Sequence, residues 1–122
     1  MRRLAVLLAA LALAGCGAEN ADDKAVRQVV TDYLAAFAAG EGAKACALML
    51  PEVQRSLGDC PARLDAAFKA LSKDQVLETQ ALTVDAVTSA GVNARARLSP
   101  TDSQIALRKA DGRWQIAGVP PS

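Results

Sequence analysis

The spacing of apolar residues changes from a helical period to a strand period partway along this chain. Between Asp23 and Ala39, apolar side chains recur at offsets of 3, 4, 7, 8 and 11, which marks one face of a helix. From Gln75 onward the period is two, and turn residues separate short apolar runs. Helices followed by strands predict an α+β domain in which N-terminal helices pack on an antiparallel sheet of three to four strands.

Capping and turn residues divide the helical part into several helices. Asp22 or Asp23 is expected to cap the first helix, and Gly40 is expected to end it. Proline favours the first turn of a helix, so Pro51 and Pro61 each predict a helix start. The helices expected after the first one cover 42–50, 51–57 and a stretch beginning at residue 61.

The lengths of two turns set the strand register expected in the later part of the sheet. A two-residue turn at 111–112 and a four-residue turn at 99–102 each fix which residues lie opposite one another. Because the apolar partners share one face, Arg95, Arg97 and Arg108 are expected on the opposite face. The expected partners are Leu107 with Ile116, Lys109 with Trp114, Ile105 with Gly118, Ala96 with Ile105, and Ala94 with Leu107.

The length of the first hairpin turn decides where Asp85 points. With a three-residue turn at 89–91, Asp85 faces Arg95 on the outer face, and such a cross-strand ion pair contributes about 0.2–1 kcal/mol. A two-residue turn would bury the carboxylate unpaired, at a cost of several kcal/mol. We therefore expect Asp85 outside, opposite or diagonal to an arginine. The inner pairs of this arrangement are Val84 with Ala96 and Leu82 with Leu98.

The beginning of the chain has the pattern of an export signal. Residues 1–15 begin with Met-Arg-Arg and continue as an apolar run that is too short to span a bilayer as a helix. The run ends in Leu13-Ala14-Gly15-Cys16, which resembles the lipobox of bacterial lipoproteins. The resemblance implies cleavage before Cys16, attachment of diacylglycerol to its thiol, and a short polar tether over 16–23.

The lipobox resemblance also implies a location. A lipidated Cys16 places the mature chain outside the cytoplasm, anchored by its lipid to the cell membrane or the outer membrane. The alternative is an ordinary secretory signal with an incidental cysteine.

Two cysteines remain once Cys16 is assigned to lipid. Cys46 and Cys60 form an even pair, and exported proteins keep disulfides, so these two are expected to bond. A closed loop of about 15 residues stabilises a fold by roughly 3 kcal/mol. The competing interpretation, a reactive thiol, lacks a histidine or a cluster of bases to activate it.

Charge and composition exclude several classes of function. The chain has 14 basic and 13 acidic residues, for a net charge of +1, which argues against a nucleic-acid-binding protein. It has no histidine, which excludes metal sites of the histidine kind and histidine-based catalysis. We therefore expect no metal, no other cofactor and no nucleic acid.

Three segments resemble the nuclear transport factor 2-like superfamily. They are 29–37 with the following Gly40, Ala45-Cys46-Ala47-Leu48-Met49, and Gly112-Arg113-Trp114-Gln115-Ile116. The resemblance implies a single cone-shaped domain over 24–119, in which a curved sheet wraps a long first helix, followed by a tail at 120–122. The alternative is another small α+β domain with helices packed on a sheet.

Some members of that superfamily are isomerases or cyclases with an acid–base residue inside the cone. Asp32 falls on the polar side of the first helix and is expected in solvent. Tyr33 is expected in the core with its hydroxyl satisfied, although it could instead point into a pocket. No general base is evident, so catalysis is not expected.

The small side chains of the inner sheet face leave space, and this space has two interpretations. The room could hold a small apolar ligand, or it could let the helices pack closely against the sheet, which is the favoured interpretation. The pocket of the first interpretation would be lined by Tyr33, Ala94, Ala96 and Trp114.

The function expected from the sequence is a lipid-anchored, extracytoplasmic binding or protein-interaction module. Its partner would be an envelope protein or a second copy of the chain, because dimers are common in the superfamily that it resembles. A carrier or sensor of a small hydrophobic ligand is the alternative, and an isomerase-like or cyclase-like enzyme is the third interpretation. A solvated, charged sheet face explains the residues of the candidate partner surface without any partner, and it is the favoured interpretation of them. These residues are Arg95, Arg97, Arg108, Arg113 and Gln115.

Overall fold

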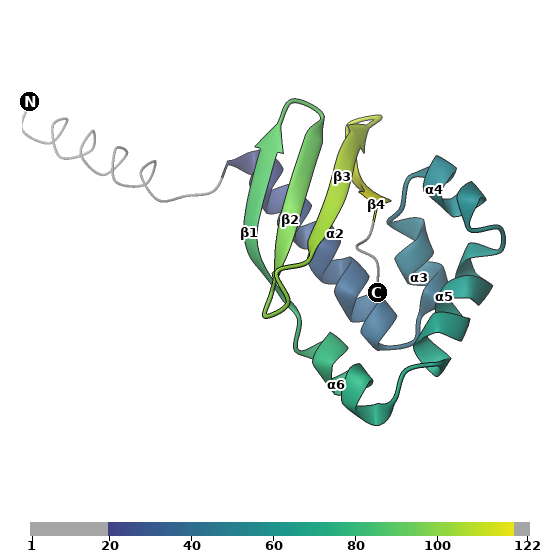
Figure 1. Cartoon of the computed structure of the whole chain (residues 1–122). Coiled ribbons are helices and arrows are strands. Elements are labelled where there is room, and N and C mark those ends of the chain that lie inside the picture. Colours follow the sequence, from purple (N-terminus) through teal and green to yellow (C-terminus); the bar gives the residue numbers. More distant parts are fainter. Residues whose placement is uncertain (1–19, 119–122) are drawn as a thin grey trace, which may run out of the picture.

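In the computed structural model, which describes residues 20–118, five helices precede an open sheet of four antiparallel strands (Figure 1). The expected α+β class and the order of helices before strands are confirmed. The helices are α2 (Ala21–Ala38), α3 (Gly42–Ala47), α4 (Pro51–Ser56), α5 (Cys60–Lys69) and α6 (Lys73–Gln80). The strands are β1 (Thr83–Ala90), β2 (Asn93–Ser99), β3 (Gln104–Ala110) and β4 (Arg113–Gly118).

The long helix α2 begins at Ala21, ahead of the predicted start at Asp23, because Asn20 is its N-cap. The Asn20 side chain accepts a hydrogen bond of 2.7 Å from the Asp23 amide. Asp22 and Asp23 therefore occupy the first turn and are not caps, although their negative charge is favourable there. Gly40 follows the helix with a φ of 73°, so its predicted role in ending the helix is confirmed.

The helix predicted over 42–50 is shorter in the structure, because α3 ends at Ala47. The segment after it runs beside β4: the Leu50 amide donates to the Ile116 carbonyl at 2.9 Å, and the Ile116 amide donates to the Leu48 carbonyl at 2.8 Å. This segment covers part of an edge that would otherwise present unpaired backbone groups. The next helix, α4, begins at Pro51 as predicted.

The strand pattern predicted from Gln75 onward is wrong at its start, because residues 73–80 form α6. Ser72 caps this helix and accepts a hydrogen bond from the Gln75 amide at 3.2 Å, while the Gln75 side chain accepts one from the Ser72 amide at 2.8 Å. This reciprocal capping box nucleates a helix locally. No residue of α6 is buried, and Leu77 is 62% exposed.

The sheet is a simple meander in the order β1-β2-β3-β4. Most of the register predicted for the last two hairpins is confirmed. The one wrong pair is Ile105 with Gly118, because a register shift between Ala106 and Leu107 sets Ala106 opposite Gly118. The confirmed pairs are Ala94 with Leu107, Ala96 with Ile105, Leu107 with Ile116, and Lys109 with Trp114.

The first hairpin differs from the prediction in its turn and its register. Ala90 lies opposite Asn93, so the turn has two residues in place of the three predicted. A bulge between Val84 and Ala86 then shifts the ladder. A bulge adds one unpaired residue to a strand, and here that residue is Asp85. The predicted partners of Val84 and Leu82 are therefore wrong: Val84 lies opposite Leu98, and Val87 lies opposite Ala96.

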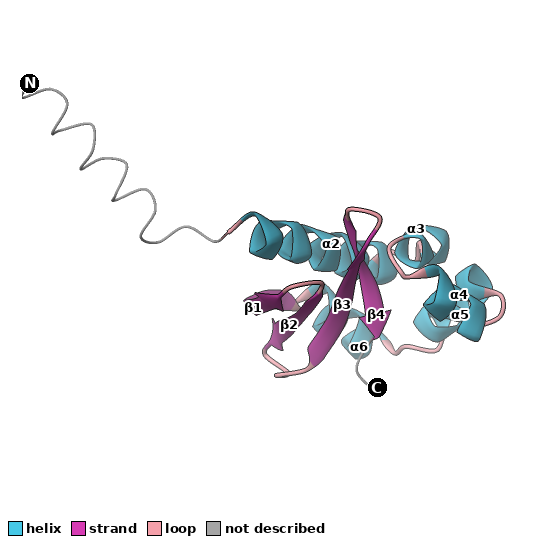
Figure 2. Ribbon diagram, turned by 90° about the horizontal axis from the view of Figure 1, so that it is seen from above, coloured by secondary structure: helices cyan, strands magenta, loops and turns pink. Residues whose placement is uncertain are grey.

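The hydrophobic core lies between α2 and one face of the sheet (Figure 2). Val26 and Val30 of α2 are fully buried in one cluster with Ile105, Leu107 and Ile116 from the strands. Burial of each such side chain contributes about 1.5–3 kcal/mol. The core thus fixes the helix across the sheet and leaves the opposite sheet face to solvent.

Candidate functional site

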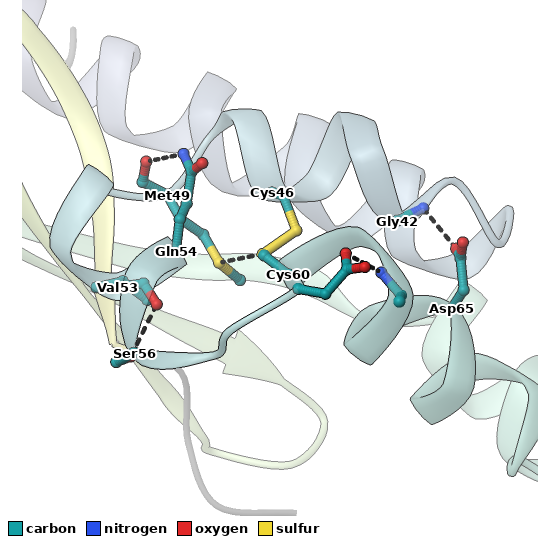
Figure 3. Close-up of a disulfide and its surroundings, with 10 residues drawn as sticks. Gly42, Cys46, Met49, Val53, Gln54, Ser56, Cys60 and Asp65 are labelled. Atoms are coloured by element: carbon teal, nitrogen blue, oxygen red, sulfur yellow. Dashed lines mark hydrogen bonds between the residues drawn. A yellow bond between two sulfur atoms is a disulfide. The ribbon is translucent and has the colours of Figure 1, made fainter.

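The disulfide predicted between Cys46 and Cys60 is present, with an S–S distance of 1.99 Å. It joins α3 to the first residue of α5, which begins one residue before the predicted Pro61 (Figure 3). Both cysteines are buried, and the Met49 sulfur lies 3.9 Å from the Cys60 sulfur. The bond therefore ties α3 to α5, next to Met49 of the segment that pairs with β4.

A second contact fastens α3 to α5 one helical turn before the disulfide. The Gly42 amide donates to Asp65 Oδ1 at 3.0 Å (Figure 3). A Cβ atom at this position would lie 2.6 Å from the Pro61 carbonyl oxygen, so only glycine fits. The two helices approach each other closely because residue 42 has no side chain.

The four residues predicted to line a pocket are all part of the hydrophobic core. Tyr33, Ala94, Ala96 and Trp114 are 7%, 5%, 0% and 6% exposed and belong to one packed cluster. The Tyr33 ring stacks on Phe37 at a centroid distance of 6.5 Å, and burial raises the pKa of the Tyr33 hydroxyl. Within residues 20–118, no polar or charged residue is buried.

Two aspartates fasten the start of α2 to the sheet, an arrangement that the sequence did not predict. Asp22 Oδ1 accepts hydrogen bonds from Trp114 Nε1 at 3.1 Å and from Lys109 Nζ at 3.3 Å. The hydrogen bond from Trp114, and to a smaller extent the one from Lys109, holds the pKa of Asp22 below its ordinary value. Asp23 Oδ1 accepts a hydrogen bond of 2.6 Å from the Ser89 hydroxyl. The sequence shows two acidic residues in the first turn of the helix, but it does not show their partners, which lie on strands far along the chain.

The outer sheet face carries the predicted arginines, and most of them have partners. Asp85 lies outside as predicted, but it pairs with Arg97 at 2.7 Å and not with Arg95. The physical reason is the bulge, which moves Asp85 along the ladder. Arg95 donates to the neutral Gln104 amide oxygen at 3.2 Å, and Arg108 forms an ion pair with Glu52.

A groove that the sequence did not reveal lies between α2, the end of α6 and β1. Its volume is about 590 Å³. The Arg27 guanidinium lies at this groove and donates to the Val84 carbonyl at 2.7 Å. Threonine and glutamine side chains add neutral polar groups, among them Thr31, Thr79, Gln80 and Thr83. The apolar lining is Leu34, Ala35, Ala38, Ala39, Leu82 and Val84.

Several predicted features fall outside the part of the chain that the structure describes. Cys16, the predicted site of lipid attachment, lies outside residues 20–118. Among the described residues, no helix is long and apolar enough to cross a membrane. The same residues contain no group of three or more histidine, cysteine, aspartate or glutamate side chains arranged to bind a metal ion.

Comparison with protein-family models, with curated proteins and with solved structures found no match to this chain.

Proposed function

We propose that this chain is a lipid-anchored, extracytoplasmic module that binds a ligand or a protein partner on its surface. The observation that carries the surface-binding part of this proposal is the packed space between α2 and the sheet, where Tyr33, Ala96 and Trp114 are core residues. Ligand sites are clefts or cavities, and the described residues form such a groove at the surface, between α2, α6 and β1.

The anchor in this proposal is Cys16. It rests on the basic and apolar leader over 1–15 and on the lipobox-like Leu13-Ala14-Gly15-Cys16. The disulfide between Cys46 and Cys60 agrees with export, because disulfides persist outside the cytoplasm. The membrane is the cell membrane or the outer membrane.

We further propose that the fold is a nuclear transport factor 2-like one. The long helix α2 lies along one face of an open antiparallel sheet, and shorter helices follow it in the chain (Figure 2). The interior of this domain differs from that of the cone-pocket enzymes implied by the resemblance, because Asp32, next to Tyr33 in the sequence, is exposed and bonds Gln28 at 2.8 Å.

A carrier of a small apolar molecule is the second candidate, and the groove between α2, α6 and β1 favours it. Ligand sites commonly measure about 300–1,000 Å³ and combine an apolar lining with a few polar groups. The groove has a volume of about 590 Å³, with Leu34, Leu82 and Val84 in its lining and Thr31 and Thr83 beside them.

Photo-crosslinking in the cells that make the protein tests surface binding directly. We expect p-benzoylphenylalanine at Thr31 or Thr83, which line the groove, to give one discrete adduct after irradiation. The matched control is the same amino acid at Thr101, in the exposed turn between β2 and β3. A protein adduct at the groove positions alone supports an interaction module, and a small-molecule adduct there supports a carrier. Equal labelling at all three positions, or no adduct at any, contradicts binding at the groove.

A further inference from the structure

Three parts of the chain meet at one end of the domain. The start of α2 is joined to β1 by the bond between Asp23 and Ser89, and to β3 by the bond between Asp22 and Lys109. Ser89 and Lys109 each lie just before a turn, the first at 91–92 and the second at 111–112. We call this end the tether end and define it as residues 20–24, 88–95 and 108–114; the turn at 99–103 lies at the opposite end of the sheet (Figure 1).

The tether end must lie close to the membrane if Cys16 carries the lipid, and this step rests on the proposed function. Asn20, where the described structure begins, lies four positions after Cys16, so the connection has four Cα–Cα steps. An extended chain covers at most about 3.3–3.6 Å per residue, so this segment spans no more than roughly 14 Å. The other end of the domain has no such restraint.

The exposed side chains of the tether end suit an anionic lipid surface. Val92, at the tip of the first turn, is 53% exposed and is one of two large apolar side chains so exposed within residues 20–118. The acidic residues there are Asp111, Asp22, which bonds Lys109 and Trp114, and Asp23, which bonds Ser89. The basic residues of the tether end are Lys24, Arg95, Arg108, Lys109 and Arg113.

A hollow on the outer sheet face adjoins this end. Its volume is about 360 Å³, and Arg95 and Arg108 both line it. The two arginines are diagonal neighbours on adjacent strands, because Arg95 lies opposite Ala106 and Asn93 lies opposite Arg108. Arg108 also pairs with Glu52 of α4, whereas Arg95 bonds the neutral Gln104. Guanidinium groups bind phosphate oxygens well, and the alanines of the hollow leave space for one headgroup.

We propose that the tether end rests on the membrane that holds the lipid anchor. In this arrangement Val92 enters the interface, and Arg95 and Arg108 bind the phosphate of an anionic phospholipid. The lipid anchor and the protein surface then act together, as two linked binding elements do. The groove between α2, α6 and β1 does not belong to the tether end and stays available to the proposed partner.

Tryptophan quenching in vesicles tests this orientation with the full mature protein. Val92→Trp and the control Thr101→Trp are purified with their lipid and reconstituted into phosphatidylcholine vesicles containing phosphatidylglycerol and brominated acyl chains. The one native tryptophan, Trp114, is buried and gives the same background in both. We expect Val92→Trp to be quenched at least threefold more than Thr101→Trp. Equal quenching of the two variants overturns the proposal.

A charge variant tests the role of the arginines. Arg95→Gln with Arg108→Gln, placed in the Val92→Trp protein, should lower its quenching in phosphatidylglycerol vesicles by at least half. The control pair Arg55→Gln and Arg63→Gln, on α4 and α5, should leave the quenching unchanged. Thermal unfolding by circular dichroism checks that each variant is folded.

The outcomes separate this proposal from the one on which it rests. A protein that carries diacylglycerol on Cys16 but shows no preferential quenching at residue 92 contradicts the orientation alone. A protein with an unmodified Cys16 contradicts both the anchor and the orientation. Unchanged quenching in the Arg95→Gln, Arg108→Gln protein overturns the phosphate contact in the hollow.

Discussion

Gly42 occupies a position where a side chain has no room. Its Cβ would lie 2.6 Å from the Pro61 carbonyl oxygen, so Gly42→Ala must push α3 away from α5. We expect a loss of about 1–3 kcal/mol in the free energy of unfolding, measured by urea titration. The matched control is Gly118→Ala, because a Cβ there meets nothing within 4 Å. If both variants lose the same unfolding free energy, the close approach of α3 and α5 does not explain the need for glycine at residue 42.

Asp22 should make the stability of the domain depend on pH. Hydrogen bonds from Trp114 and Lys109 lower its pKa in the folded state, so the charged form is favoured by folding. Its contribution is therefore complete above the unfolded-state pKa, about 3.9, and is lost as the pH falls through the lower folded-state pKa. We expect wild type to be more stable than Asp22→Asn at pH 7 and this difference to shrink below about pH 4.

The control for this prediction is Asp102→Asn. Asp102 has a φ of 61°, which asparagine also tolerates, and its side chain makes no hydrogen bond or ion pair with the described residues. Urea titrations of the three proteins between pH 3 and pH 7 give the comparison. A wild-type advantage over Asp22→Asn that stays constant across this range would contradict the charge-dependent role of Asp22.

At the level of elements, the disulfide is expected to hold α3 and α5 in place. Its 14-residue separation closes a loop whose restraint stabilises a fold by roughly 3 kcal/mol. We expect the double variant Cys46→Ala, Cys60→Ala to lose about that much unfolding free energy, again by urea titration. A reductant should destabilise wild type by a similar amount and leave the double variant unaffected. Resistance of wild type to the same reductant in urea, with no shift in midpoint, would contradict this role.

Elements with strong local signals were predictable from the sequence. The apolar period of α2 and the short turns of the last two hairpins act within a few residues, so they identified the helix and most of the register. The capping box of Ser72 and Gln75 is equally local and marks α6, but a period of two in the following residues favours a strand. The two local signals predict different structures for residues 73–80, and the segment forms the helix that the capping box indicates.

The bulge at Asp85 depends on contacts that no local pattern contains. The Arg27 guanidinium of α2 binds the Val84 carbonyl at 2.7 Å, and Arg97 binds the Asp85 carboxylate at 2.7 Å. The outer position of Asp85 was predictable because burying an unpaired carboxylate is costly. The bulge itself was not predictable, because the groups that bond to it, Arg27 and Arg97, come from other elements.

For the whole molecule, the candidate site was the least predictable part. The disulfide was predictable from the number of cysteines. Tyr33 was predicted on the apolar face of the first helix, and Ala94, Ala96 and Trp114 on the inner sheet face. All four lie in the core cluster of the structure. The groove between α2, α6 and β1 could not be predicted. It forms where α2 meets the end of α6 and the start of β1, far along the chain, and the period of two predicted no helix at α6.

The central claim is that this chain works outside the cytoplasm on a lipid anchor at Cys16. The intact mass of the mature protein, purified from the envelope fraction of the cells that make it, tests this claim most directly. The account predicts a chain that begins at Cys16 and carries diacylglycerol. Hydrolysis of the esters should remove the mass of the acyl chains and leave a glyceryl group bonded to the Cys16 sulfur. A mature chain that still begins at Met1, or one cleaved elsewhere without lipid, would contradict it.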